Sequence, residues 1–236
     1  MRTAWRWCAA IGIVAFTISS LFSRIPGLIA CGPTGGLAPI AAFEFARTTS
    51  DIATMFGSEP CTTTLVAAQK TGLLLDGLGF IPSYTAFLIL GTIAAGARGR
   101  IKTVLIAIFV VAAVSDEIEG FLLNAILDHL PGTPALLHGL WWAVHAKFAL
   151  LALGTLGIGE RVARGRLLQR LFAAAIVPGS LLAIFGLLTA SGGWMMTGFT
   201  IAWVALLFGA LIASFWPSLF SPARAGPQPD QAAPSA

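Results

Sequence analysis

Six runs of about twenty apolar residues occupy most of this chain. A helix needs about 20 apolar residues to cross a bilayer, where only helices and closed barrels satisfy their backbone polar groups. Hydrophobic residues make up 57% of the chain and charged residues only 10%, against about 25% charged in a soluble domain. We therefore predict an all-α membrane protein, a six-transmembrane-helix bundle, with spans at about residues 7–28, 71–95, 101–123, 134–156, 171–190 and 194–216.

The basic residues indicate how the chain is threaded. Of the 14 Lys and Arg residues, Arg24, Arg47 and Lys70 fall on the outer side, Lys147 falls within a span, and the remaining ten lie on the other side if the N-terminus is inside. Cytoplasmic loops of membrane proteins carry an excess of Lys and Arg. We therefore expect both termini in the cytoplasm and a multi-pass location in the bacterial inner membrane, surrounded by lipid.

The basic residues sit at the ends of segments and form no single patch, so we expect no nucleic-acid partner. The transmembrane domain is predicted to cover residues 1–220. The following segment, residues 221–236, is rich in Pro and Ala and is predicted to be a disordered cytoplasmic tail.

The largest segment outside the predicted spans is an outer loop at residues 29–70. Asp51 marks the start of a short helix, with Thr49 or Ser50 as its N-cap. Residues 37–45 (LAPIAAFEF) are apolar enough to lie on the bilayer surface or to cover the ends of the spans.

Cys31 and Cys61 both lie in this loop, whereas Cys8 lies near the cytoplasmic end of the first span. An oxidising outer compartment permits a disulfide between Cys31 and Cys61, which is our preferred interpretation. Two alternatives stay open: a pair of unpaired buried thiols, or lipidation of Cys31, because residues 28–31 (LIAC) are similar to a bacterial lipobox.

Charged residues inside the predicted spans are the main clue to function. An ionisable side chain in mid-membrane costs about 2.5–3.5 kcal/mol, so it normally faces the bundle interior and finds a partner. Asp116 follows Lys102 by fourteen residues and Lys147 precedes Arg161 by fourteen, which places both roughly 21 Å from the cytoplasmic end. The third and fourth spans are antiparallel neighbours, so Asp116 and Lys147 can meet.

Helical periodicity assigns faces to the neighbouring residues. Glu119 shares a face with Asp116, and Gly120 beside it would allow close helix approach. Glu117 lies on another face, with Asn124. On the fourth span, His138 and His145 share a stripe roughly opposite Lys147.

By the same count, His145 lies slightly above Asp116 and Lys147, and Asp76 lies near the outer interface. The candidate binding cluster is therefore Asp76, Asp116, Glu119, Lys147 and His145. It is either an outward-opening site for proton relay or for a small polar or cationic ligand, or an ion pair that fixes helix register.

A metal site would join His138 and His145 to carboxylates, but two histidines seven residues apart are weak evidence, so we predict no metal. The chain has no HExxH, no serine-centred elbow and no glycine-rich phosphate loop. No cofactor is therefore predicted, and no catalytic residue can be named.

Three stretches together resemble a family of small bacterial multi-span membrane proteins without a known activity. They are residues 43–48 (FEFART), residues 75–84 (LDGLGFIPSY), and Asp116 with Glu119. In this chain Gly120 stands where that family has Asn, and Gly79 shifts the first motif. The resemblance covers about residues 43–150 and implies that Asp76, Asp116, Glu119 and Lys147 form one constellation.

The sequence thus favours a membrane protein acting in transport, in ion or proton handling, or in ligand sensing. Two alternatives are a membrane-embedded enzyme acting on a lipid or quinone, and an accessory subunit that assembles with partner helices. The two would differ in experiment: an enzyme loses function when Glu119 or His145 is replaced, whereas an accessory subunit co-purifies with its partner.

Overall fold

The structure, a computed structural model, describes residues 2–217 and 220, and these residues contain helices and no strand. The predicted tail, residues 221–236, lies outside the described residues. The helices in chain order are α1 (Arg2–Phe22), α2 (Pro39–Glu44), α3 (Thr49–Phe56), α4 (Cys61–Leu75), η1 (Asp76–Phe80), α5 (Ile81–Ala94), α6 (Gly99–Asp128), α7 (Pro134–Ala163), α8 (Leu167–Leu188) and α9 (Gly192–Phe215).

Five helical segments in the described part of the chain are long and apolar enough to cross a membrane. They are α1, the continuous segment Cys61–Ala94, α7, α8 and α9. The third predicted span, α6, is as long as α7 but is not among these five segments, because Asp116, Glu117 and Glu119 interrupt its apolar run. The chain is therefore a membrane protein by the length and composition of its helices.

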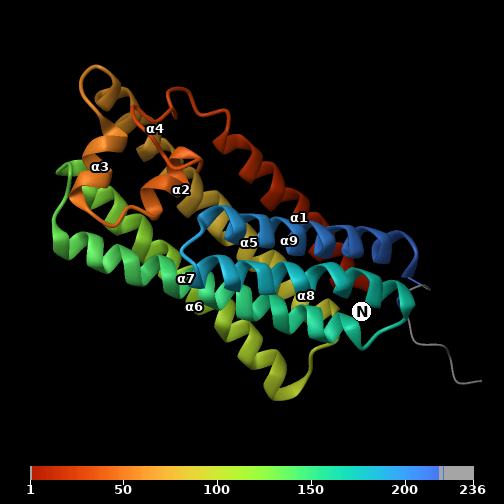
Figure 1. Cartoon of the computed structure of the whole chain (residues 1–236). Helices are drawn as coiled ribbons and strands as arrows, with labels where there is room; N and C mark the ends of the chain where they lie inside the picture. Colours follow the sequence, from red (N-terminus) through yellow and green to blue (C-terminus); the bar gives the residue numbers. More distant parts are fainter. Residues whose placement is uncertain (1, 218–219, 221–236) are drawn as a thin grey trace, which may run out of the picture.

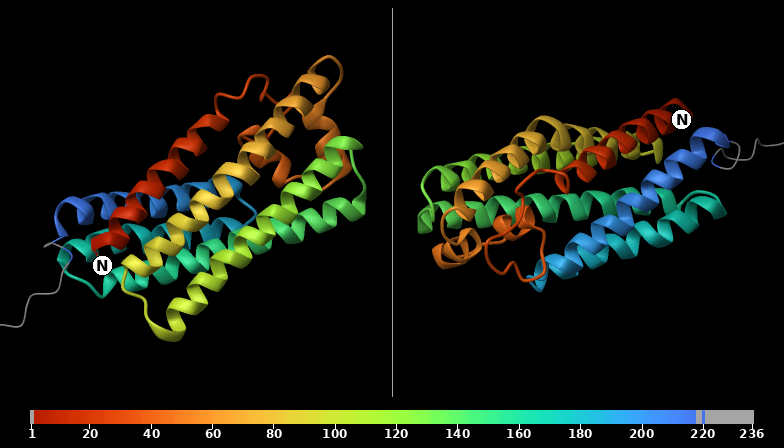
Figure 2. Two further views of the ribbon diagram at one scale, coloured as in Figure 1. Left: turned by 180° about the vertical axis from the view of Figure 1, so that it is seen from behind. Right: turned by 90° about the horizontal axis from the view of Figure 1, so that it is seen from above.

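The long helices form a closed ring. Helices that follow one another from α5 to α9 pack side by side, and α1 packs between α5 and α9 to close the ring. The N-terminus and the α5–α6 and α7–α8 connections lie at one end of the bundle, whereas α2, α3 and the α6–α7 connection lie at the other (Figures 1 and 2). The expected antiparallel pairs α6–α7 and α8–α9 are confirmed.

Small residues allow α8 and α9 to approach closely. A Cβ atom on Gly179 would lie 2.8 Å from the carbonyl oxygen of Gly198 and 2.9 Å from the backbone nitrogen of Ala202. Such small-residue contacts replace the hydrophobic effect as the basis of helix packing in lipid.

The second predicted span differs from its prediction in two ways. It begins at Cys61 rather than near residue 71, because the polar residues before the apolar run are also helical. It also contains a π-helical turn, η1, in which the backbone N–H of Ile81 donates to the carbonyl of Asp76. The turn directly precedes Pro82, which has no N–H and crowds the preceding turn, and a widened turn accommodates such a residue.

The outer loop folds into a cap over one end of the bundle. The N-cap of α3 is Thr48, one residue before the predicted Thr49 or Ser50. Its hydroxyl accepts from the backbone N–H of Asp51, and the Asp51 carboxylate accepts from the N–H of Thr48 at 2.8 Å. This capping box explains the shift, because it requires an acidic residue at the third helical position.

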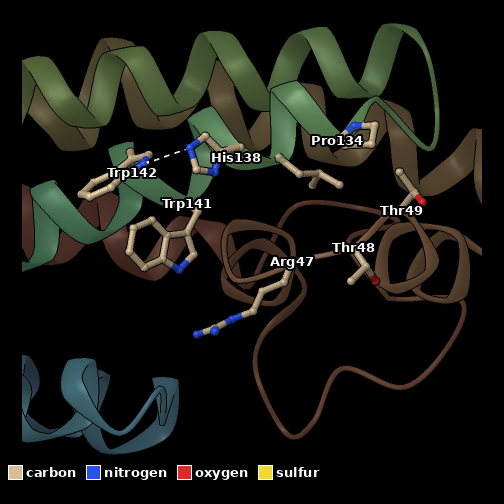
Figure 3. A pocket seen from close by; sticks show the side chains of 8 residues that line it. Arg47, Thr48, Thr49, Pro134, His138, Trp141 and Trp142 are labelled. Carbon is tan, nitrogen blue, oxygen red and sulfur yellow. Dashed lines mark hydrogen bonds between the residues drawn. The ribbon is translucent and has the colours of Figure 1, made fainter.

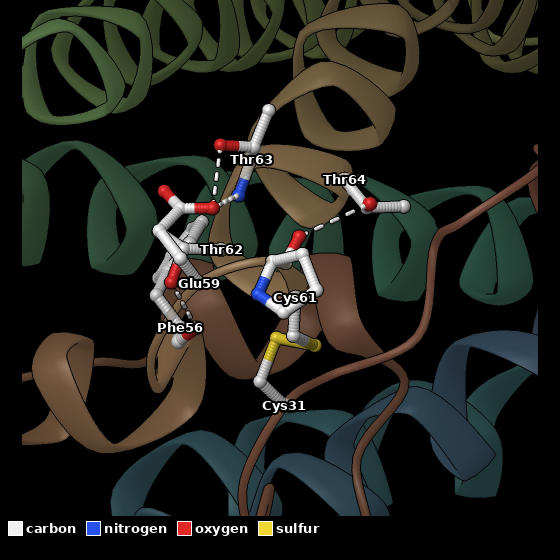
Figure 4. Close-up of a disulfide and its surroundings, with 8 residues drawn as sticks. Cys31, Phe56, Glu59, Cys61, Thr62, Thr63 and Thr64 are labelled. Atoms are coloured by element: carbon white, nitrogen blue, oxygen red, sulfur yellow. Dashed lines mark hydrogen bonds between the residues drawn. A yellow bond between two sulfur atoms is a disulfide. The ribbon is translucent and has the colours of Figure 1, made fainter.

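A disulfide joins Cys31 to Cys61, as predicted, with 5.9 Å between their Cα atoms (Figure 4). It ties the chain leaving α1 to the first residue of α4. Cys8 is a buried free thiol. With its sulfur in the disulfide, Cys31 is not available for the lipid attachment considered above.

Candidate buried polar site

Lys147 lies at the centre of a buried group of acidic side chains. Its ammonium nitrogen Nζ lies 2.8 Å from Oδ1 of Asp116 and 2.7 Å from Oε2 of Glu119. The Glu119 contact is an ion pair without the angles of a hydrogen bond. The predicted meeting of α6 and α7 through these residues is therefore observed, and the three side chains are each at most 5% exposed.

Glu44 is a further carboxylate at Lys147, and it was not predicted as a site residue. Its Oε2 lies 3.4 Å from Nζ, across 103 residues of sequence. It is the last residue of α2, whose Phe43 is buried and whose following residue, Phe45, stacks on Phe148 at 5.7 Å. An acidic residue inside the apolar run at residues 37–45 was the available signal.

The environment of Glu44 favours its protonated form. Burial raises the pKa of its carboxyl above the ordinary value of 4.5; the Lys147 charge lowers that pKa and the Asp116 charge raises it, with a net upward shift. Glu44 therefore holds its proton at a higher pH than an exposed glutamate does.

Tyr84 supplies a hydroxyl to the same group. This residue, the only tyrosine in the chain, lies on α5 and is almost fully buried. Its hydroxyl donates to Oδ2 of Asp116 at 2.7 Å, so the two Asp116 oxygens have different partners. We call Glu44, Tyr84, Asp116, Glu119 and Lys147 the buried cluster.

Asp76 lies beside the buried cluster without an ion pair or hydrogen bond from its side chain to any described residue. It interacts electrostatically with Asp116, Lys147, Glu44 and Glu117, as expected if it belongs to the same constellation. It is the first residue of the π-helical turn, which alters the facing that a regular helix would give it.

Asp76 also lines a groove between α4 and α6, which we call the acidic groove. The groove has a volume of about 390 Å³, and its polar lining consists of Lys70, Asp76, Glu117, Asn124 and Asp128. Lys70 and Asp128 form an ion pair of 2.5 Å across it. The predicted shared face of Glu117 and Asn124 is confirmed, because both line this groove.

The expected role of Gly120 is wrong. A Cβ atom at this position would meet nothing within 4 Å, so Gly120 does not serve close helix packing. It lines the acidic groove instead. Helical periodicity assigns Gly120 to one face of α6, but it does not show whether that face contacts another helix or lines a groove.

His145 is not brought into contact with the carboxylates. Its ring stacks on Trp141 with 4.0 Å between centroids, and its Nδ1 hydrogen-bonds with the Trp141 carbonyl at 2.7 Å. His138 accepts a hydrogen bond at Nε2 from Trp142. Both histidines therefore follow the aromatic stripe of α7, as the helical spacing indicated, and neither has a polar contact with the buried cluster.

The buried cluster combines three carboxyl groups, one hydroxyl group and one ammonium group. Within the described residues, no group of three or more His, Cys, Asp or Glu residues is placed to hold a metal ion. Comparisons of the chain with known protein families, with curated proteins and with solved structures give no match.

Proposed function

We propose that this chain is a six-span, multi-pass protein of the bacterial inner membrane that relays protons between the outer side and its buried cluster. The single observation that carries the proposal is the shared use of Lys147. Asp116, Glu119 and Glu44 all have an oxygen within 3.4 Å of its one ammonium group.

Charge balance is the physical reason. If Glu44, Asp116 and Glu119 were all ionised, one lysine would face three negative charges where water cannot solvate them, and Asp76 nearby would add a fourth. Ionised groups in such surroundings either pair or neutralise, because desolvation costs several kcal/mol per ion. Neutralisation of the surplus carboxylates by protons is the least costly solution, and it makes the buried cluster a store of exchangeable protons.

The acidic groove provides the route. It extends from Lys70 on α4 and Asp128 at the end of α6 to Asp76, and Asp76 interacts electrostatically with Asp116. A proton captured at Glu117 or Asp128 can pass to Asp76 and then to the buried cluster. Intramembrane chains of acidic residues commonly act as proton relays.

The placement of basic residues supports the orientation. Arg98, Arg100 and Lys102 begin α6, and Arg161, Arg164 and Arg166 lie at the α7–α8 connection, which is at the same end of the bundle as the N-terminus (Figure 1). An excess of Lys and Arg is typical of the cytoplasmic side. The acidic groove and α2 then face outward.

Proton uptake by proteoliposomes tests the proposal. Vesicles containing a pH-sensitive dye are given a potassium diffusion potential, negative inside, to draw protons inward. We expect vesicles with the wild-type protein to acidify faster than protein-free vesicles. Glu119→Gln and Glu44→Gln should remove this excess rate, because a relay step that loses its positioned acid slows by roughly a hundredfold.

Glu59→Gln is the matched control, because Glu59 is an exposed outer residue with the same side chain and lies outside the buried cluster. It should leave the rate unchanged. Wild-type vesicles that acidify no faster than protein-free vesicles would rule out a relay.

A further inference from the structure

A second pocket lies beside the outer cap, and no residue of the buried cluster lines it. It is formed where the loop after α2 faces the beginning of α7, and its volume is about 680 Å³. We call it the tryptophan pocket. Its lining consists of Arg47, Thr48, Thr49, Pro134, Leu137, His138, Trp141 and Trp142 (Figure 3).

The pocket presents hydrogen-bond donors and no carboxylate. The side chain of Arg47 is exposed, and its guanidinium group makes no ion pair or hydrogen bond with any part of the chain that the structure describes. In Figure 3 it extends past Trp141 with its end free of the other side chains drawn. Asp51, an acid whose charge interacts with Arg47, already accepts from the backbone N–H groups of Arg47 and Thr48.

His138 adds a donor of defined position. The indole Nε1 of Trp142 donates to Nε2 of His138 at 3.2 Å. When Nε2 accepts this bond, the neutral ring carries its proton on Nδ1, which is then a donor. Arg47 and His138 therefore offer donors from opposite walls of the same pocket.

Apart from Thr48 and Thr49, the remaining lining residues are apolar. Trp142 is 58% exposed, and it lies two turns into α7 from the outer end of that helix. Indole rings at such positions settle at the level of the lipid headgroups. Pro134 and Leu137, at the start of α7, and Trp141, one turn further along the helix, continue this apolar surface.

We propose that the tryptophan pocket binds the phosphate group of an outer-leaflet phospholipid, with an acyl chain against the indole rings. The guanidinium fork of Arg47 matches two phosphate oxygens, a geometry that lysine lacks. His138 donates to the same phosphate. This site does not depend on the proposed proton relay, because none of its lining residues belongs to the buried cluster.

Quenching of tryptophan fluorescence by brominated lipid tests the proposal on the full chain in neutral detergent micelles. Phosphatidylglycerol with brominated acyl chains is titrated, and we expect saturable quenching. Arg47→Gln should raise the lipid fraction needed for half-quenching about tenfold. This change corresponds to the binding free energy of one charge-assisted hydrogen bond. Arg47→Lys keeps the charge but loses the fork, and should give a smaller shift in the same direction.

Arg24→Gln is the matched control, because Arg24 is also exposed on the outer side but does not line the pocket. It should leave the titration unchanged, and an equal effect of Arg24→Gln and Arg47→Gln would overturn the site. Brominated diacylglycerol, which has the same chains without phosphate, should not saturate, and quenching equal to that by phosphatidylglycerol would overturn the role of phosphate. Full displacement of the brominated lipid by inorganic phosphate would show a site for the free anion and overturn the lipid assignment.

Discussion

The hydroxyl of Tyr84 and the ammonium group of Lys147 hold the two oxygens of Asp116 separately. Tyr84 donates to Oδ2 at 2.7 Å and Lys147 lies 2.8 Å from Oδ1. The two partners come from α5 and α7, so Asp116 on α6 joins three helices of the ring. The carboxylate is therefore fixed in position as well as charge-paired.

Tyr84→Phe should lower the thermal stability of the protein without changing how the aromatic side chain at position 84 packs. The change removes one hydrogen bond to a charged group, which typically contributes about 1.5–3 kcal/mol, and leaves the aromatic ring beside Trp203 at 5.6 Å. We expect a lower Tm in detergent. Thr103→Val, which removes the hydroxyl of an exposed residue near the start of α6, is the control and should have little effect. An unchanged Tm for Tyr84→Phe would mean that the bond does not hold Asp116.

The Cys31–Cys61 disulfide should be detectable and stabilising. The intact mass without reductant should be two hydrogens below that of the reduced form. The bond closes a segment with a sequence separation of 30, which corresponds to roughly 3 kcal/mol in the chain-entropy model. We expect Cys31→Ser and Cys61→Ser to lower the Tm equally, and the double variant to lower it no further. A lipid attached to Cys31 would contradict the bond.

The capping box of α3 should open in acid. Hydrogen bonds from the backbone N–H of Arg47, and then of Thr48, hold the pKa of Asp51 below its ordinary value of 3.8. A depressed pKa means that the stabilisation is complete above that ordinary value and is lost as the pH falls toward the folded-state pKa. Hydrogen exchange of α3 should therefore accelerate in that window relative to Asp51→Asn at the same pH. Equal exchange in the two proteins above that window, where Asp51 is ionised, would show that the cap does not depend on this charge.

The helical, membrane-spanning class and the disulfide could be predicted because their signals are local. Span length follows from composition over about twenty residues, and the disulfide follows from the position of two cysteines in one loop. The Asp116–Lys147 contact could be predicted because a short loop makes α6 and α7 antiparallel, and both residues are equally far in sequence from basic residues at the same end of the bundle. Among the six predicted spans, α6 alone is not one of the five candidate spans in the described part of the chain. The carboxylates that define the site also make this helix less apolar.

The missed parts of the site depend on contacts between distant segments. Glu44 reaches Lys147 only because α2 folds back over the bundle, and no periodicity within α2 encodes that packing. His145 was included by its height alone, but its stacking on Trp141 directs it to the aromatic stripe of α7. Gly120 is a similar case, because the sequence does not show whether a glycine on a helix faces another helix or lines a groove.

Cysteine labelling on both sides of the α4–α5 segment tests the proposed orientation. Ser58 and Arg100 are both exposed and lie on opposite ends of the bundle, so Ser58→Cys should react with an impermeant maleimide in intact cells. Arg100→Cys should react only after the membrane is opened. Two spans, α1 and the α4–α5 segment, separate the N-terminus from Arg100. Reaction of Arg100→Cys from outside would reverse the proposed orientation and place the acidic groove in the cytoplasm.

A double-mutant cycle measures the central ion pair. Asp116→Asn or Lys147→Met alone leaves buried charges without their partner, and loss of one member of a buried pair typically costs about 3–5 kcal/mol. The double variant should lose less stability than the sum of the two single losses. Recovery will be partial, because Glu44 and Glu119 also depend on Lys147.

Lys70 and Asp128 provide the matched control for this cycle. They form the same kind of pair between α4 and α6, but their side chains are 45% and 53% exposed, and solvent-exposed ion pairs contribute little to stability. Lys70→Met with Asp128→Asn should therefore show little coupling. If the buried pair were no more strongly coupled than the exposed one, water would have to reach Lys147, and the shortage of positive charge on which the proton relay rests would disappear. If the double-mutant cycle instead gives strong coupling, and the folded double variant has lost proton uptake, Asp116 and Lys147 would be needed both for stability and for function.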